Sequence, residues 1–205
     1  MALAPVLQFP SVRTVPSSVE TTDRRDKNYL TAPEIARLLA AAKHGRYGVR
    51  DHAMLFLAYR HGLRVSELVG LRVHDLDLDT AKLWVKRLKG SLSTEQPIEG
   101  DTLRAVRQWL RARETMRGKD LPWLFISERG AMSRKAVNYL IAKAGVRAGL
   151  SCHVHPHMLR HSCGYYLANK GLDTRLIQDY LGHKNIQHTV RYTRTAAKRF
   201  EGLWR

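Results

Sequence analysis

Long apolar runs are absent from this chain of 205 residues, and without 18 consecutive apolar residues no membrane-spanning helix is expected. Cysteine is scarce as well: Cys152 and Cys163 are too few for a disulfide-stabilised scaffold and fit a reducing cytoplasm. The apolar start of the chain lacks a preceding basic segment and is interrupted by Pro5 and Pro10, which argues against a secretory signal. We therefore expect a cytoplasmic protein with no membrane partner.

Acidic residues are missing from one long stretch, because neither Asp nor Glu occurs between Glu128 and Asp173. Residues 129–205 contain 14 Lys and Arg against three acidic residues, and the whole chain has a formal net charge of +17. A merely solvated basic face is one explanation. A surface that faces phosphate groups explains the local loss of carboxylates better, so the composition favours a polyanionic partner, most often nucleic acid.

Residues 1–28 are rich in Ser, Thr and Pro and lack hydrophobic periodicity, which predicts a flexible arm. One domain is expected to follow, over residues 29–205. Thr31 and Glu34 have the three-residue spacing of a capping box and predict a helix that runs to about residue 43.

Hydrophobic periodicity, capping residues and glycine stops predict the remaining elements. Helices are expected over residues 49–61, 66–68, 101–117, 133–149, 156–171, 173–182 and 185–204. Between residues 76 and 98 the period changes to two, which predicts an antiparallel sheet of two or three short strands. The expected fold class is mainly α with one small antiparallel β-sheet, an α+β domain.

Four histidines lie close together at positions 153, 155, 157 and 161, and their spacing first suggests a zinc site. No carboxylate is near in sequence, and Arg160 among them would repel a divalent cation, so we expect no metal. If Pro156 begins a helix, His157 and Arg160 are three residues apart and share one face. A cation and an imidazole on a face without carboxylates indicate a site that binds phosphate.

Two further segments gain meaning only in combination with this face. Arg64 follows the helix-stopping Gly62, and Glu67 could orient its guanidinium, although that segment alone suggests a surface ion pair of little consequence. Tyr192, taken alone, would be a packing or DNA-contact residue of a basic helix. Together, two arginines for phosphate oxygens, a histidine for protons and a tyrosine nucleophile meet the demands of phosphoryl transfer at DNA.

With these residues in order, the sequence resembles the tyrosine recombinases of the phage integrase family. The resemblance covers about residues 29–205 and implies the integrase catalytic-domain fold. It also implies a site-specific recombinase that cleaves and rejoins DNA through a 3′-phosphotyrosyl intermediate. The segments GLRVSEL, HPHMLRHSCGY, DTRLIQDYLGH and HTVRYT are similar to the small recombinases that invert fimbrial promoter switches in enteric bacteria. The six positions that match the family, in its order, are Arg64, Lys89, His157, Arg160, His183 and Tyr192.

The resemblance implies a catalytic role for each matched residue. Arg64 and Arg160 would hold the non-bridging phosphate oxygens. Tyr192 would attack the phosphorus, and His157 would assist the transfer of its proton. His183 would donate a hydrogen bond to the phosphate.

Lys89 would protonate the leaving 5′ oxygen, because it precedes the turn glycine of the predicted hairpin as the family lysine commonly does. Lys86, in the same hairpin, is the alternative. A second set of basic residues lies beside Lys89 or at the start of the helix that begins near residue 133. The residues expected to contact DNA are Lys86, Arg87, Arg134 and Lys135.

No cofactor is expected, because the phosphotyrosine keeps the bond energy and two arginines supply the charge of a metal. The expected partners are double-stranded DNA with inverted-repeat sites, further copies of the chain in a dimer or tetramer, and accessory DNA-bending proteins at the bacterial nucleoid. The segment 197–205 would join the copies through Phe200, Leu203 and Trp204, or would instead pack on its own core. Two other functions stay open: a type IB topoisomerase, and a DNA-binding transcription regulator that has lost catalysis.

Overall fold

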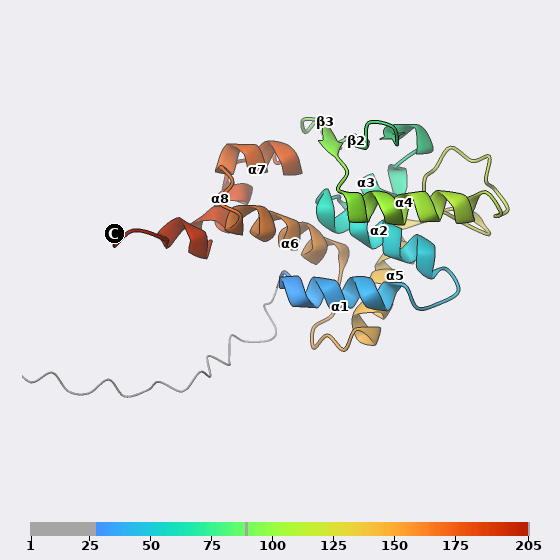
Figure 1. Cartoon of the computed structure of the whole chain (residues 1–205), viewed down its shortest axis with the longest axis horizontal. Helices are drawn as coiled ribbons and strands as arrows, with labels where there is room; N and C mark the ends of the chain where they lie inside the picture. Colours follow the sequence, from blue (N-terminus) through green and yellow to red (C-terminus); the bar gives the residue numbers. More distant parts are fainter. Residues whose placement is uncertain (1–27, 89, 205) are drawn as a thin grey trace, which may run out of the picture.

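The computed structural model describes residues 28–88 and 90–204, and most of its elements are helices (Figure 1). The α-helices are α1 (Ala32–Ala42), α2 (Gly48–Arg60), α3 (Val65–Gly70), α4 (Gly100–Arg113), α5 (Arg134–Arg147), α6 (Pro156–Asn169), α7 (Thr174–Leu181) and α8 (Gln187–Arg194). The 3₁₀ turns and strands are η1 (Val73–Asp75), η2 (Ala197–Phe200), β1 (Leu76–Asp77), β2 (Lys82–Val85), β3 (Thr94–Pro97), β4 (Ile126–Ser127) and β5 (Gly130–Ala131). The predicted fold class, mainly α with little antiparallel β, is confirmed. Nearly all of the arm predicted over residues 1–28 lies outside the described residues.

Capping side chains set the start of several helices. Glu34 accepts a hydrogen bond from the backbone N–H of Thr31 at 2.8 Å, which completes the predicted cap of α1. Ser133 and Asp173 accept backbone N–H groups in the first turns of α5 and α7. The helix expected over residues 101–117 instead begins at Gly100, with Glu99 as its N-cap residue.

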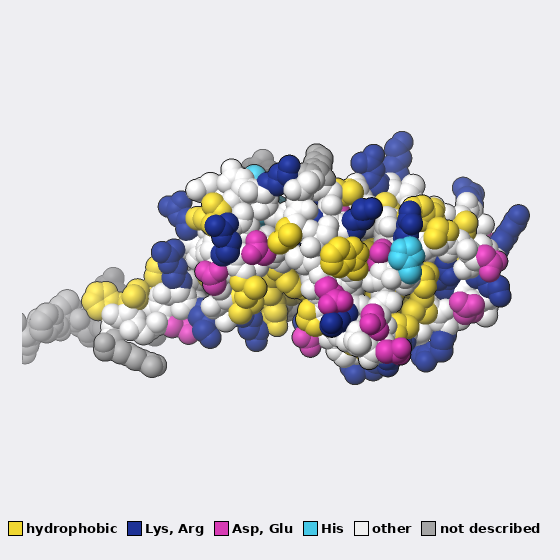
Figure 2. Space-filling view, turned by 90° about the horizontal axis from the view of Figure 1, so that it is seen from above, with side chains coloured by type: hydrophobic (Ala, Val, Ile, Leu, Met, Phe, Trp, Pro, Cys, Tyr) yellow, Lys and Arg dark blue, Asp and Glu magenta, His cyan; other side chains and the backbone are white. Residues whose placement is uncertain are grey.

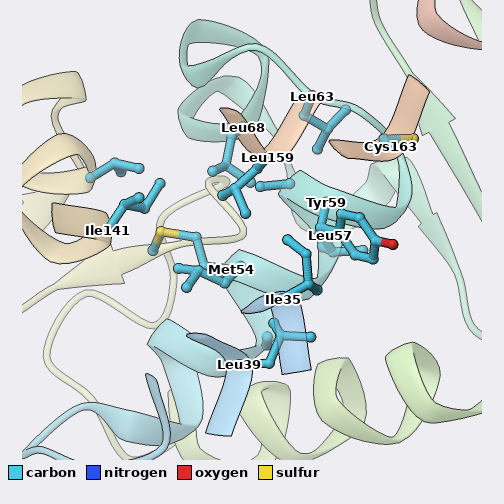
Figure 3. Packing of buried hydrophobic residues seen from close by; sticks show 14 of the residues in the cluster. Ile35, Leu39, Met54, Leu57, Tyr59, Leu63, Leu68, Ile141, Leu159 and Cys163 are labelled. Carbon is cyan, nitrogen blue, oxygen red and sulfur yellow. The ribbon is translucent and has the colours of Figure 1, made fainter. Parts of the chain in front are cut away.

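Helices α1, α2, α4, α5 and α6 pack around one hydrophobic core (Figure 3). Leu38 of α1, Met54 of α2, Ile141 of α5 and Leu159 of α6 are completely buried in it. Burial of each side chain of this size favours folding by about 1.5–3 kcal/mol. The core therefore holds α6, which carries two of the predicted site residues, rigidly against α2.

The three-stranded sheet lies beside α7. Its order is β1-β2-β3, with antiparallel pairs throughout and Leu83 opposite Gln96. Leu83 and Val85 point inward, whereas Lys82 and Trp84 point to solvent, as the predicted two-residue period requires. Gln96 donates a hydrogen bond to the carbonyl of Tyr180 at 2.8 Å and so attaches the sheet to α7.

Two elements differ from the sequence-based expectation. The short hairpin β4–β5 pairs Ser127 with Gly130, and its strands of two residues are too short for a periodic signal. The single helix expected over residues 185–204 is wrong, because α8 ends at Arg194 and is followed by the 3₁₀ turn η2. Ala196 between them is extended and buries its methyl group, which turns the chain out of the helical path.

The end of the described chain projects away from the helices (Figure 1). Phe200, Leu203 and Trp204 are 55%, 64% and 99% exposed, so these side chains do not pack on their own core. Within residues 28–88 and 90–204, no helix is long and apolar enough to cross a membrane.

Candidate active site

A buried carboxylate, Glu67, lies at the centre of the candidate site. Its side chain is 1% exposed, and its oxygens accept hydrogen bonds from Arg64 Nη1 at 2.6 Å and from Arg87 Nη1 at 2.8 Å. Arg160 Nη1 lies 4.0 Å from the same carboxylate. Burial acts to raise the pKa of Glu67, but Arg87 and Arg64 outweigh it and hold the pKa below its usual value. Glu67 is therefore ionised at neutral pH.

Backbone carbonyls orient the two arginines predicted to bind phosphate. Arg160 donates from Nη1 to the carbonyl of Gly62 at 2.5 Å and from Nη2 to the carbonyl of Leu181 at 2.7 Å. Arg64 donates from Nη2 to the carbonyl of Gly182 at 3.3 Å and remains 30% exposed. Burial and the neighbouring guanidinium groups lower the pKa of Arg160 to about 10, which still leaves it positively charged at neutral pH. Two loops, one after α2 and one after α7, thus converge on one cationic site.

Each of these loops contains a position that must be glycine, because neighbouring side chains approach its backbone too closely for a Cβ atom. Gly62 and Gly182 both have left-handed backbones, with φ of +55° and +65°. A Cβ on Gly62 would lie 2.3 Å from Leu181 Cδ2, and a Cβ on Gly182 would lie 2.9 Å from Arg87 Cγ. Any side chain here would push apart the loops whose carbonyls hold the arginines.

The expectation that Arg87 contacts DNA is wrong in this structure. Its side chain is fully buried, and besides Glu67 it donates to the carbonyls of His61 and Tyr180 at 3.0 and 2.5 Å. The sequence contained the signal, because the inward positions of β2, 83 and 85, continue by the same period to 87. Lys86 is outward and exposed, as its predicted role requires.

The predicted general acid, Lys89, lies outside the described residues. Its neighbour Gly90 is described, and Lys184 Nζ lies 3.3 Å from the position that a Cβ of Gly90 would occupy. Lys184 therefore reaches the hairpin turn from the loop after α7. Sequence reasoning missed this lysine, although it directly follows His183.

Tyr192 of α8 is placed against α6. It is 1% exposed, and its hydroxyl lies 2.8 Å from Nδ1 of His161. Its ring contacts those of Tyr165 and His183, with centroids 5.0 and 6.1 Å away. Burial raises the pKa of Tyr192, while Arg191 and Arg160 act to lower it. The net shift is upward, so the hydroxyl keeps its proton at neutral pH.

His183 lies between Tyr192 and the arginines. Its Nδ1 is 2.8 Å from Oγ1 of Thr189. Burial, followed by the charges of Arg160 and Arg64, lowers the pKa of His183 to about 3. The ring is therefore neutral and can donate a single hydrogen bond from its second nitrogen when Nδ1 accepts.

His157, the predicted partner of Tyr192 in proton transfer, is exposed on the first turn of α6 beside His155. The hydroxyl of Tyr192 is bonded to His161, one helical turn further along. Sequence reasoning did not assign His161, although positions 157, 160, 161 and 164 share one helical face.

Arg134 and Lys135 are exposed at the start of α5, where a DNA contact was predicted. Figure 2 shows Lys and Arg side chains around the edges of the face in view, the lower edge included, and acidic side chains among them, mostly on its lower half. In the described ranges, no group of three or more His, Cys, Asp and Glu side chains is arranged to hold a metal ion.

Comparison of the sequence with known proteins identifies the family of this chain. Residues 28–199 match the phage integrase family. The chain belongs to this family. It is a tyrosine recombinase, an enzyme that breaks and rejoins DNA strands, and its resemblance to this family is thereby confirmed.

The relatives of this phage integrase family member include the Type 1 fimbriae regulatory proteins of Escherichia coli (strain K12). FimE is 48% identical over 180 residues, which are 87% of this chain and 91% of FimE. FimB is 45% identical over 183 residues, which are 89% of this chain and 92% of FimB. The crystal structure of XerA recombinase has a TM-score of 0.74 and 30% identity, covering 83% of this chain and 61% of XerA.

Glu67→Gln should destabilise the folded protein, because it removes the carboxylate charge between buried guanidinium groups. We expect a loss of about 3–5 kcal/mol in the free energy of unfolding at pH 7, measured by urea denaturation. The matched control is Glu95→Gln, which breaks an exposed pair with Lys82 and should cost less than about 1 kcal/mol. Similar losses in both variants would contradict the central role of Glu67.

The difference in unfolding free energy between the parent protein and Glu67→Gln should depend on pH, because folding lowers the pKa of Glu67. A carboxylate whose pKa is depressed by folding stabilises the protein above its unfolded pKa of about 4.5. That stabilisation is lost as the pH falls through the lower, folded pKa. The gap between the parent protein and Glu67→Gln should therefore be constant from pH 7 to 5 and shrink in more acidic solution. A gap that widens on acidification would contradict the direction of the shift.

Proposed function

We propose that this recombinase cleaves DNA by attack of Tyr192 on a scissile phosphate, leaving a 3′-phosphotyrosyl bond and a free 5′ hydroxyl. One observation carries the proposal: Arg64, Arg160, His183 and Tyr192, distant in sequence, gather around the loops that Glu67 holds together. A phosphodiester carries one negative charge, and this site offers it guanidinium groups already fixed in place.

Each group has a chemical task that suits its environment. Arg64 and Arg160 bind the non-bridging oxygens and stabilise the charge of the transition state. Neutral His183 donates a hydrogen bond to the phosphate. His157, exposed on the first turn of α6, assists the proton transfer from Tyr192 once the nucleophile has approached the DNA. The phosphotyrosyl bond conserves the energy for rejoining, so neither ATP nor a metal ion is needed.

The biological reaction that we propose is inversion of a DNA segment bounded by inverted repeats, such as a fimbrial promoter switch. Its support is the 48% and 45% identity to FimE and FimB, both named as Type 1 fimbriae regulatory proteins, over nearly their whole length. The substrate is double-stranded DNA at the bacterial nucleoid. Bending proteins bound nearby would bring the two repeats together.

We further propose that two or four copies assemble on the paired sites through the C-terminal segment. Phe200, Leu203 and Trp204 form an exposed apolar end on a chain that projects from its own domain. Such side chains bind where they are removed from water, and a neighbouring copy on DNA offers that environment.

Tyr192→Phe should abolish covalent attachment to DNA while leaving DNA affinity nearly unchanged, because only one hydroxyl is removed. Denaturing gel electrophoresis after incubation with DNA that contains the inverted repeats measures the adduct, and gel shift measures affinity. An adduct in the variant would refute the nucleophile assignment. Absence of adduct in the parent would favour the inactive regulator, and relaxation of any supercoiled DNA without a specific site would favour a topoisomerase.

Lys89→Ala should slow strand cleavage about 100- to 10,000-fold, the usual contribution of a general acid. A substrate with sulfur at the 5′ bridging position needs no proton on its leaving group and should recover most of the rate. Lys86→Ala, in the same hairpin, and Lys184→Ala, whose side chain reaches the hairpin turn from the loop after α7, are the matched controls and should change cleavage little. Sulfur rescue of either control, instead of Lys89→Ala, would transfer the role to that lysine.

The double variant Leu203→Ser and Trp204→Ser should lose cooperative binding to paired sites. Its binding to a single half-site and its unfolding midpoint should stay unchanged, because both side chains are exposed in the isolated chain. Gel shifts on half-sites and full sites separate the two effects. Val73→Ser, which changes another exposed apolar side chain, is the control. Normal assembly of the double variant would exclude this segment as the contact.

A further inference from the structure

The nucleophile of the proposed reaction is withdrawn from the surface, whereas two of the groups proposed to act on the phosphate and on the proton, Arg64 and His157, are accessible. Tyr192 is 1% exposed. The Arg64 side chain is 30% exposed, and His157 is exposed on the first turn of α6. A phosphate group of duplex DNA stays at the protein surface, so Tyr192 cannot attack it from this position.

A notch in α6 receives the ring of Tyr192. A Cβ placed on Gly164 would lie 2.6, 2.7 and 2.8 Å from Cε2, Cδ2 and Cζ of the ring, far closer than any side chain permits. Tyr165 meets the same ring edge to face. The ring thus occupies the space that any side chain larger than hydrogen at position 164 would take.

His161 fixes the other end of the tyrosine. Its Nδ1 lies 2.8 Å from the hydroxyl of Tyr192, in hydrogen-bond range. Burial, followed by the charge of Arg191, lowers the pKa of His161 to about 4, so the imidazole is neutral at physiological pH. A neutral ring protonated on Nε2 accepts a hydrogen bond from the Tyr192 hydroxyl at Nδ1. The raised pKa of Tyr192 keeps the proton of this hydrogen bond on the hydroxyl oxygen.

We propose that His161 is a positioning residue, which holds the Tyr192 hydroxyl in the notch above Gly164 until DNA is bound. The inference rests on the proposed role of Tyr192 as nucleophile and adds how that nucleophile is withheld. Cleavage requires the hydrogen bond between His161 and Tyr192 to break and the ring to leave the notch. The retracted and the reactive positions of Tyr192 are in equilibrium, and His161 favours the retracted one.

His161→Phe tests the inference, because phenylalanine keeps a ring but offers no acceptor nitrogen. Loss of one hydrogen bond should raise the population of the reactive position and speed covalent attachment about 2- to 10-fold at saturating DNA, and DNA affinity should rise by no more than the same factor. Single-turnover adduct formation on a half-site oligonucleotide measures the rate. His153→Phe, at an exposed histidine outside the notch, is the matched control and should react like the parent.

A second readout follows Tyr192 without DNA. Nitration of the free protein by tetranitromethane, mapped by mass spectrometry, should leave Tyr192 protected in the parent and modify it in His161→Phe. Gly164→Ala should expose Tyr192 as well, because the new methyl group fills the notch. Alanine also favours a helix over glycine, so α6 itself is not weakened by this change.

Two results would overturn the inference. Slower cleavage by His161→Phe at saturating DNA would mean that His161 assists the chemistry instead of withholding the nucleophile. Protection of Tyr192 from nitration in both variants would mean that the notch is not maintained by His161 or Gly164. If the parent forms no adduct, the nucleophile assignment fails, while nitration still decides whether His161 holds Tyr192.

Discussion

One buried negative charge organises the active site of this recombinase. The carboxylate of Glu67 has two guanidinium groups in hydrogen-bond contact and a third, that of Arg160, at 4.0 Å. Three such cations repel one another in a medium of low dielectric constant, and without Glu67 they would separate. With it, two positive charges remain uncompensated, and a phosphodiester, with its single negative charge, would neutralise one of them. Stability and the proposed phosphate binding thus depend on the same carboxylate.

The arginines transmit this constraint to the fold. Arg87 donates to carbonyls before α3 and at the end of α7, and Arg160 joins Gly62 to Leu181. The hairpin, α3, α6 and the loop after α7 are therefore tied together by side chains that bind backbone, since the sheet itself is too small to do so. Buried donors that find carbonyls in several elements fix one arrangement, because any other would leave them unsatisfied.

The sequence predicted what depends on neighbours along the chain. Caps such as Ser133 and Asp173, glycine stops and the two-residue period of β2 are local signals, and the helices and sheet that they predict are present. Contacts between distant segments were predicted less well. Arg87 was assigned to DNA because charge suggests a surface, although its period placed it inside. His161 was overlooked because its importance depends on where α8 packs, which no pattern within α6 encodes.

The burial of the proposed nucleophile, beside the more accessible Arg64 and His157, has a physical consequence. DNA binding can release Tyr192 only if the released position interacts with DNA more favourably than the retracted one does. The retracted position is held by one hydrogen bond and by ring contacts with Tyr165, which itself packs on Tyr29 at a centroid distance of 4.2 Å. Such contacts are worth about 0.5–1.5 kcal/mol each, an energy that a few phosphate contacts exceed. Access to Tyr192 is thus coupled to the packing of α6 on both of its sides, and contacts within the described helices are sufficient to hold the proposed nucleophile in the retracted position.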